Sequence, residues 1–189
     1  MSAAHNNREI ADRFRVIALR FCSLVDAAPN MDRTELLVAV YRMLPGLIDE
    51  AVRLPEVELS EKHDELAPKA ARLRSHDHQR LYPMLKEKLG DWDLYRHVFD
   101  PTKDEEAILG TLSDDLADIY HDLKDGLILD ETLQAPPEDS IWTWRLLFHS
   151  HWGEHAISAL GAIHRRLFDT IFFLAPVAGE LCASRYSSP

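Results

Sequence analysis

Cysteine, glycine and long apolar runs are all scarce in this sequence, and each scarcity excludes a class of protein. The two cysteines, Cys22 and Cys182, match no metal-binding or redox spacing. The seven glycines form no phosphate-cradling loop. The longest apolar run begins at Thr170 and is about half as long as a membrane span requires. No charged and then apolar leader opens the chain, so we expect a cytoplasmic protein.

Basic residues are also few. The chain has 32 acidic residues against 21 basic ones, and its formal net charge is −11. Nucleic-acid binding requires a basic face that neutralises phosphates, and no cluster of Lys and Arg stands out. The same charge repels an anionic membrane surface. The composition therefore predicts no nucleic-acid partner and no membrane partner, and it leaves basic partners and metal cations open.

What the sequence does contain is the composition of a helical globule, with 46% hydrophobic and 28% charged residues. We expect helices in the following stretches: 8–27, 32–51, two within 61–90 that break near Pro68 and "RSHDH", 104–112, 113–127 and 138–172. Cys22 falls on an apolar stripe and is expected in the core. No strand pattern is found. The prediction is an all-α fold over 1–189: a single helical bundle of five to seven helices, the last long one central, with an irregular charged middle segment. Residues 170–189 are predicted to form an apolar C-terminal extension that packs on apolar surface.

The stretch 138–172 carries three histidines close together, His149, His151 and His155. On a regular helix His149 and His151 point about 160° apart and cannot share a metal ion, whereas His151 and His155 lie one turn apart. The pair gives "HWGEH", which matches the zinc-protease pattern H-x-x-E-H. We reject that family, because its third ligand is a carboxylate far downstream and Glu180 is the only glutamate after His155. The alternative is that both histidines bond neighbouring backbone or carboxylate groups at the edge of the core.

Arg145 lies beside His149 on the apolar stripe of the same helix, where a guanidinium needs a partner or must extend to solvent. We expect an ion pair with an aspartate of the preceding helix, and ligand binding is the alternative. If a groove between the two helices takes a ligand, the candidate binding residues are Arg145, Trp152, Tyr120 and His149.

The stretch 113–127, "SDDLADIYHDLKDGL", places a row of carboxylates along one side of a helix that Ser113 is expected to cap. The row consists of Asp115, Asp118, Asp122 and Asp125. These side chains fall within about 80° of one another, opposite or beside the buried face. Such a row repels itself unless a cation or a basic group relieves it.

Two interpretations of the aspartate row follow. It is either a solvated acidic face with one or two salt bridges, or a divalent-metal row. All-α pyrophosphohydrolases of the MazG type hold Mg²⁺ with acidic pairs on neighbouring bundle helices. Glu61 with Asp64 is the only other acidic pair that could complete such an arrangement here.

Four stretches together carry a family resemblance: "FCSLVD" at 21–26, "MLPGLIDEAVRLP" at 43–55, "SDDLADIYHDLKDGL" at 113–127 and "HWGEHAISALGAIH" at 151–164. Through them the sequence resembles, over most of its length, an uncharacterised bacterial family, the domain of unknown function 5063. The resemblance implies a helical fold and a bacterial cytoplasmic setting, without an established activity. It also places Asp115, Asp118 and Asp122 in recurring motifs, so we expect these aspartates to contact the histidine helix, Arg145 or a partner.

Two functions of different classes remain open. The first, favoured because the chain lacks a complete catalytic constellation, is a non-enzymatic interaction or regulatory module. It would offer an acidic groove between the 113–127 and 138–168 helices to a protein partner or to a second copy of the chain.

The second function is a divalent-metal-dependent hydrolase on the same two helices. Its ligands would be Asp115, Asp118 and Asp122, and His151 or His155 would complete the site. A divalent metal ion is the one cofactor that the sequence indicates. The hydrolase interpretation is supported if the aspartates and the histidines face each other across a pocket.

Overall fold

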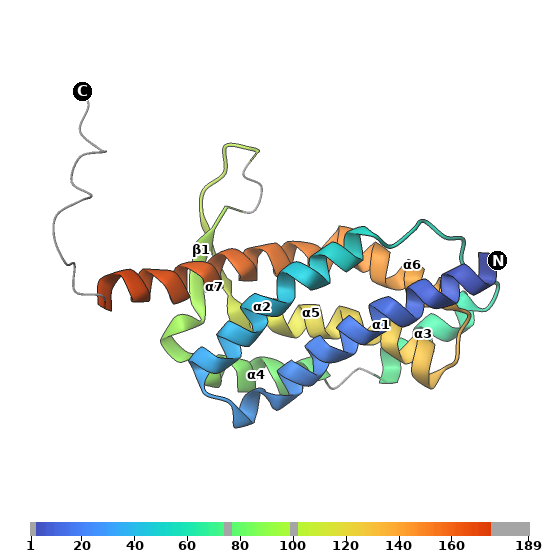
Figure 1. Ribbon diagram of the computed structural model, residues 1–189, viewed down its shortest axis with the longest axis horizontal. Coiled ribbons are helices and arrows are strands. Elements are labelled where there is room, and N and C mark those ends of the chain that lie inside the picture. The colour runs from blue at the N-terminus through green and yellow to red at the C-terminus, as the bar shows by residue number, and fades with distance from the viewer. Residues whose placement is uncertain (1–2, 74–76, 99–101, 175–189) are drawn as a thin grey trace.

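Two antiparallel helices open the chain in the computed structural model, which describes residues 3–73, 77–98 and 102–174. Helix α1 spans Ala3–Ala27, and a 3-10 turn at Ala28–Asn30 leads to α2 at Arg33–Val52. Asp32 caps α2, because its side chain accepts a hydrogen bond from the backbone N–H of Glu35 at 2.9 Å. Figure 1 shows the two helices side by side across one face of the molecule.

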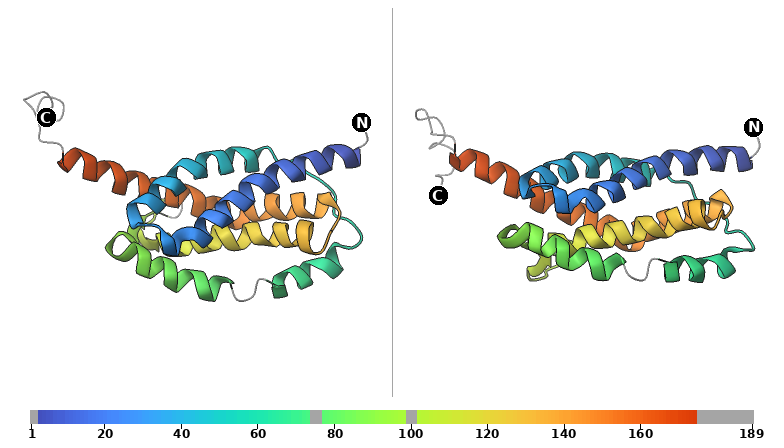
Figure 2. Two further views of the ribbon diagram at one scale, coloured as in Figure 1. Left: turned by 60° about the horizontal axis from the view of Figure 1, so that its bottom comes forward. Right: turned by 90° about the horizontal axis from the view of Figure 1, so that it is seen from below.

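The charged middle segment forms two short helices, as expected. Helix α3 spans His63–Leu73 and α4 spans Asp77–Leu89. Pro68 lies inside α3, so the predicted break at this proline is wrong, whereas the break predicted at "RSHDH" begins at residues 74–76, which lie outside the described part of the chain. Helix α4 buries Leu81, Leu85 and Leu89 and packs against the next long helix. Figure 2 shows α3 and α4 following one another along the same side of the bundle.

A small β-hairpin stands where a helix was expected over 104–112. Strand β1, Leu94–His97, pairs antiparallel with β2, Ile108–Thr111, after a 3-10 turn at Gly90–Trp92. The prediction of a helix here, and of no strand, is wrong. Each strand has only four residues, so neither shows an alternation that can be detected in the sequence. Figure 1 shows the hairpin crossing the last long helix and extending beyond the bundle.

Helix α5, Leu112–Leu127, is the central element of the bundle, and not the last long helix as we expected. It contacts α1, α4, α6 and α7. Thr111 caps it by accepting a hydrogen bond from the N–H of Asp114 at 3.3 Å. The predicted cap, Ser113, is buried instead, and both its N–H and its hydroxyl donate to the buried carboxylate of Asp93. Asp93 thereby joins the hairpin to α5.

The rest of the described chain is helical apart from one short connection. A π-helical turn at Ile128–Thr132 ends α5, and α6 follows at Pro137–Leu147. A second π-helical turn, Phe148–Trp152, joins α6 directly to α7, Gly153–Leu174. The continuous helix expected over 138–172 is therefore present, with one turn of different geometry inside it.

A main core of apolar side chains lies between α1, α2, α4, α5, α6 and α7. Its largest fully buried members are Trp144, Trp152, Tyr120, Phe14 and Phe21, together with leucines of α2 and α4. Cys22 belongs to this core, and burial raises the pKa of its thiol to about 12. The all-α prediction is confirmed, with the hairpin added to it. Residues 175–189, most of the predicted C-terminal extension, lie outside the described part of the chain.

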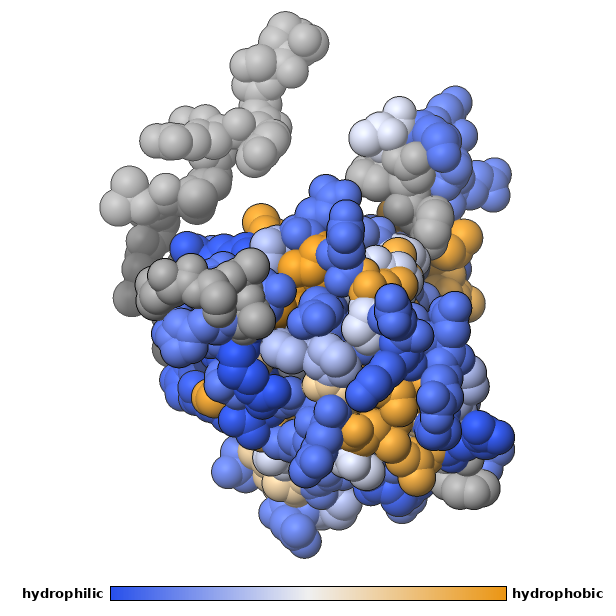
Figure 3. Space-filling view, turned by 90° about the vertical axis from the view of Figure 1, so that its right-hand side faces the viewer, coloured by the Kyte–Doolittle hydropathy of each residue, from blue (hydrophilic) through white to orange (hydrophobic). Residues whose placement is uncertain are grey.

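One end of the bundle has a mainly polar surface. Figure 3 views one end of the molecule, where hydrophilic residues cover most of the surface and hydrophobic ones gather in a smaller area between them. Within residues 3–73, 77–98 and 102–174, no helix combines the length and the apolar character of a membrane span.

Candidate metal centre

The π-helical turn "FHSHW", Phe148–Trp152, decides how the histidines are presented. A π turn holds one more residue than an α turn, so it rotates the side chains that follow it. Gly153 ends the turn with ordinary helical dihedral angles, but a Cβ atom there would lie 2.3 Å from the carbonyl oxygen of Phe148. Only glycine fits so close to the backbone. His151 thereby reaches Asp122 on α5 although its side chain is 45% exposed, and His149 is exposed as well.

Each of the two remaining histidines is held by a buried aspartate of α5. Nδ1 of His151 lies 2.7 Å from Oδ2 of Asp122, and Nδ1 of His155 lies 2.9 Å from Oδ1 of Asp115. Both aspartates are only 4% exposed. An ionised carboxylate only accepts hydrogen bonds, so Nδ1 donates in each pair and Nε2 is the nitrogen left for another partner.

Asp118 lies between the two histidines. A ring nitrogen of His151, a ring nitrogen of His155 and a carboxylate oxygen of Asp118 all lie within 4.8 Å of one another. Nε2 of His155 is 3.5 Å from Oδ2 of Asp118, and the centroids of the two imidazoles are 4.8 Å apart. Two imidazoles and one carboxylate therefore converge where α5 and α7 meet.

The hairpin contributes one more residue to this cluster, Tyr95, which the sequence did not predict. The hydroxyl of Tyr95 on β1 donates to Oδ2 of Asp115 at 2.7 Å, so both oxygens of this carboxylate are used. Burial raises the pKa of Asp115, and its hydrogen bonds to His155 and Tyr95 oppose that rise. The bond to Asp115 in turn raises the pKa of His155. Tyr95 could not be found from the sequence, because its strand was not predicted.

A cavity of about 300 Å³ opens beside this cluster, under the hairpin. His151 and His155 line one side of it, and Thr111 and Asp114 at the start of α5 line another. Glu154, the would-be base of the rejected zinc-protease pattern, is exposed and also lines the cavity. A substrate or a water molecule could therefore reach the histidines from this side.

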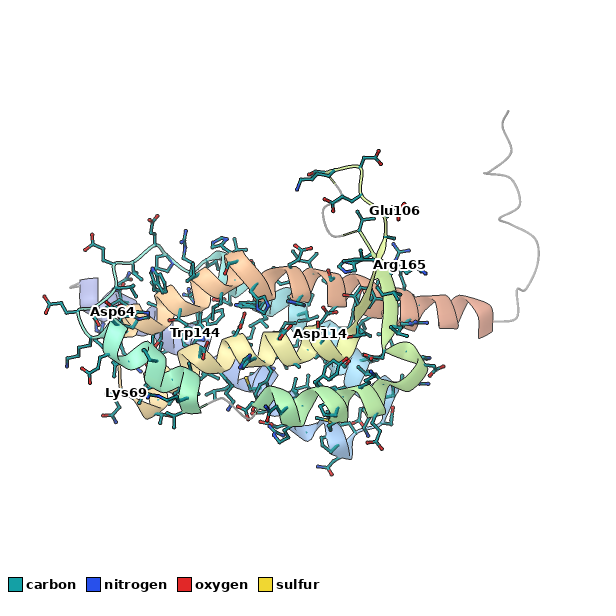
Figure 4. The ribbon with its side chains drawn as sticks, turned by 180° about the vertical axis from the view of Figure 1, so that it is seen from behind. Asp64, Lys69, Glu106, Asp114, Trp144 and Arg165 are labelled. Carbon is teal, nitrogen blue, oxygen red and sulfur yellow. The ribbon has the colours of Figure 1, made fainter. Side chains whose placement is uncertain are left out.

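The structure brings the metal candidates of the sequence together but gives them different positions. Asp118, His151 and His155 converge, whereas Asp115 and Asp122 lie behind the histidines. The interpretation of the row as a solvated acidic face is wrong for Asp115 and Asp122, because both are buried and paired with His155 and His151. The second acidic pair of a MazG-type site is not nearby: Figure 4 shows Asp64 on α3 at one end of the molecule, well separated from Asp114 at the start of α5.

The binding candidates are not gathered into a site of their own. The side chains of Trp152 and Tyr120 are 0% and 2% exposed and belong to the core. His149 is exposed and contacts the ring of Phe148. Arg145 is half-buried, and among the residues that the structure describes it has no carboxylate within 4.0 Å, so the expected ion pair is not found.

The fold and the cluster define the class of this protein: it is a helical bundle that has paired His and Asp side chains between two helices and a hairpin over them. The comparisons then give the family. The domain of unknown function (DUF5063) family matches residues 5–169, and the chain belongs to that family.

A solved structure shows the same fold. The crystal structure of protein BF1032 from Bacteroides fragilis, a structural genomics target, superposes with a TM-score of 0.64 and is 23% identical in sequence. The match covers 88% of this chain and 94% of that one. Comparison with functionally curated proteins gives no match.

Proposed function

We propose that this protein binds a divalent transition-metal ion through Nε2 of His151, Nε2 of His155 and the carboxylate of Asp118, and uses the ion to activate water for hydrolysis. The single observation that supports this most is the pairing of both Nδ1 atoms with buried carboxylates. Metal-binding histidines almost always donate their second ring N–H to a carboxylate or carbonyl, which fixes the ring and raises its basicity. Two such pairs aimed at one further carboxylate form the ligand set of a metal centre.

The donor atoms favour a transition metal over Mg²⁺ or Ca²⁺. Two imidazole nitrogens and one carboxylate oxygen suit Zn²⁺, Fe²⁺ or a neighbouring ion, whereas Mg²⁺ and Ca²⁺ take oxygen ligands. Catalytic zinc is typically held by three protein ligands and keeps a further position for water. The spacing of the aspartates suggested that several of them bind Mg²⁺ directly. In this proposal only Asp118 is a direct ligand.

Hydrolysis is the chemistry that Zn²⁺ held by these three residues would supply. A bound Zn²⁺ lowers the pKa of its water to about 7, which makes hydroxide available at neutral pH. The cavity of about 300 Å³ beside His151 and His155 gives a substrate access to that position.

The alternative, a non-enzymatic module with an acidic docking groove, receives less support. An acidic groove attracts a basic partner when its carboxylates are exposed, and those of Asp115 and Asp122 are buried against histidines. An interaction role becomes the better proposal if the protein binds no metal.

Metal content tests the proposal directly. Tag-free protein, purified without chelator, is expected to carry about one transition-metal ion per chain by plasma mass spectrometry. His151→Ala and Asp118→Asn should each lose the metal while circular dichroism shows the helical fold retained. His149→Ala is the matched control, because it removes an exposed histidine two residues from a ligand and should keep the metal.

Titration of the chelator-treated protein completes the test. Zn²⁺ or Mn²⁺ at about a hundred times the dissociation constant should stabilise the fold by about 2.7 kcal/mol, which thermal melting can detect. Metal-loaded protein should then hydrolyse members of an ester and phosphoester panel, and Asp118→Asn should not. A protein that carries no metal and is not stabilised by any added ion would contradict the metal centre. A protein that binds the ion without hydrolysing the panel would contradict the catalytic part alone.

A further inference from the structure

A second and larger cavity, of about 580 Å³, adjoins the first one on the other side of the hairpin. Tyr95, His97 and Ser158 line both cavities, so the two are neighbours. Along α7, the positions 155, 158, 162 and 165 follow at spacings of three or four residues and therefore lie on one face of the helix. That face leads from His155 of the metal centre into the second cavity.

The charge of this cavity is the reverse of the charge of the whole protein. Its lining includes Arg96 from β1 and the successive residues Arg165 and Arg166 from α7. No Asp or Glu is among its lining residues in the described part of the chain. The protein as a whole has a net charge of −11, and the cavity beside the histidines is lined by Asp114, Asp115 and Glu154. A cavity with an acidic lining and a cavity with a basic lining thus lie next to each other.

Two of the three arginines form no ion pair with the residues that the structure describes. Among the residues that the structure describes, no carboxylate lies within 4.0 Å of Arg96 or Arg165. Arg166 is fixed in place, because it donates to the carbonyl oxygen of Leu94 at 2.7 Å and so ties α7 to β1. Figure 4 shows Arg165 on α7 at the point where the hairpin crosses it, while Glu106 lies out on the hairpin arm. An anion could therefore be held between the hairpin and α7.

The remaining walls indicate what the anion is attached to. The cavity also has an apolar part, formed by Trp92, Val98, Ile157 and Ala162. Its volume suits a small organic molecule more than an inorganic ion alone. Guanidinium groups bind phosphate through two parallel hydrogen bonds and are the preferred residues for this purpose.

We propose that this second cavity binds the phosphate group and the apolar body of a phosphorylated small molecule, and that this molecule is the substrate of the metal centre. The assignment as substrate rests on the proposed hydrolase function, whereas the binding of the phosphorylated molecule does not. Arg96 and Arg165 bind the phosphate, and the apolar wall contacts the organic part. The bound molecule would extend past Ser158 toward the ion on His151 and His155.

The binding test uses metal-free protein, so that its result does not depend on the metal centre. Phenylphosphonate, which combines a phosphate-like dianion with an apolar ring and is not hydrolysed, is titrated by calorimetry into the full-length, chelator-treated protein. We expect saturable binding that Arg96→Gln and Arg165→Gln each weaken at least about tenfold, as expected for the loss of a charge-assisted hydrogen bond. Arg20→Gln, which removes an exposed arginine of α1, is the matched control and should bind as the unaltered protein does.

A fourth variant blocks the cavity without removing a charge. A Cβ atom at Gly161, which lines the cavity, meets no protein atom within 4 Å, so a larger side chain has open space there. Gly161→Leu should therefore fold at least as stably, since leucine favours helices over glycine, and should lose phenylphosphonate binding.

Three results would overturn the proposal: no saturable binding, unchanged binding in the arginine or Gly161→Leu variants, or equal binding of benzoate. The last would show that the cavity accepts any small aromatic anion. A protein that binds phenylphosphonate but no metal would retain this cavity as a phosphate site and lose the hydrolase function. A protein that binds metal but not phenylphosphonate would retain the metal centre and refute this proposal.

Discussion

Asp115 and Asp122 are buried carboxylates whose partners explain their position. Burying an unpaired charge costs several kcal/mol, so a buried aspartate needs hydrogen bonds that favour its charged form. Asp115 receives them from His155 and Tyr95, and Asp122 receives one from His151. The same bonds fix the rotation of both imidazoles. At this scale the two aspartates position the imidazoles, and Asp118 is the carboxylate that lies close to both of them.

This division of roles predicts a graded response to mutation. Asp122→Asn should weaken Zn²⁺ binding by about 10- to 100-fold without abolishing it, because it removes the charge that orients His151 but no ligand. Asp118→Asn should cost more, since it alters a ligand itself. Competition with a chromophoric chelator measures both affinities. Asp49→Asn, on the exposed side of α2, serves as control and should leave the affinity unchanged. Equal losses in Asp122→Asn and Asp118→Asn would show that the two carboxylates are not divided in this way.

At the scale of elements, one π-helical turn and one hairpin build the surroundings of the site. The turn Phe148–Trp152 changes the direction of the side chains between α6 and α7, and the hairpin covers the cavity that opens there. Such turns occur often at functional sites, where they reorient a side chain within an otherwise regular helix. The hairpin is tied down by Asp93 at α5 and by Arg166 at α7.

Two glycines of α7 should therefore respond differently to the same substitution. Gly153→Ala places a methyl group against the carbonyl oxygen of Phe148 and should destabilise the fold by about 1–3 kcal/mol while lowering metal content. Gly161→Ala meets open space and should be neutral or stabilise by up to about 1 kcal/mol, because alanine is the better helix former. Chemical denaturation measures both changes. A Gly153→Ala protein as stable and as metal-rich as the unaltered one would mean that the π turn is dispensable.

At the scale of the whole molecule, the His155–Asp115 pair links stability to pH. The pKa of His155 is raised in the fold by its hydrogen bond to Asp115, whereas an unfolded histidine titrates near pH 6.5. Below about pH 6.5 the imidazole is protonated in both states, and its pairing contributes fully to stability. As the pH rises through the higher folded-state pKa, that contribution is lost.

Metal-free protein should consequently melt at a lower temperature near pH 8 than near pH 6, and His155→Gln should show a smaller decrease over the same range. Zn²⁺ should reverse this trend, because it binds the neutral imidazole and its stabilising effect grows as protons leave. Calorimetric melting at several pH values, with chelator or with Zn²⁺, measures both trends. An identical decrease in the unaltered protein and in His155→Gln would refute the role of this pair.

Much of the helical fold could be predicted from the sequence, because the buried residues of a helix recur every three or four positions along the chain. The stripe that contains Phe14, Phe21 and Val25 predicted α1, and these side chains are buried. The hairpin escaped prediction because its pairs join residues more than ten positions apart, such as His97 with Ile108. Ser113 was misassigned as a cap because its real partner, Asp93, lies on that hairpin.

The candidate site, too, could be predicted only as far as local spacing along a helix allows. The sequence by itself determined that His151 and His155 lie one turn apart, that a row of aspartates follows one side of α5, and that the chain resembles its family through both stretches. Only the tertiary structure decided that Asp118 lies close to both imidazoles, that Asp115 and Asp122 bond their Nδ1 atoms, and that Arg96 and Arg165 line one cavity. Spacing within a helix is set by the backbone geometry of its own residues. The rotation of α5 against α7, and the position of the hairpin over them, depend on how side chains from the whole chain pack together.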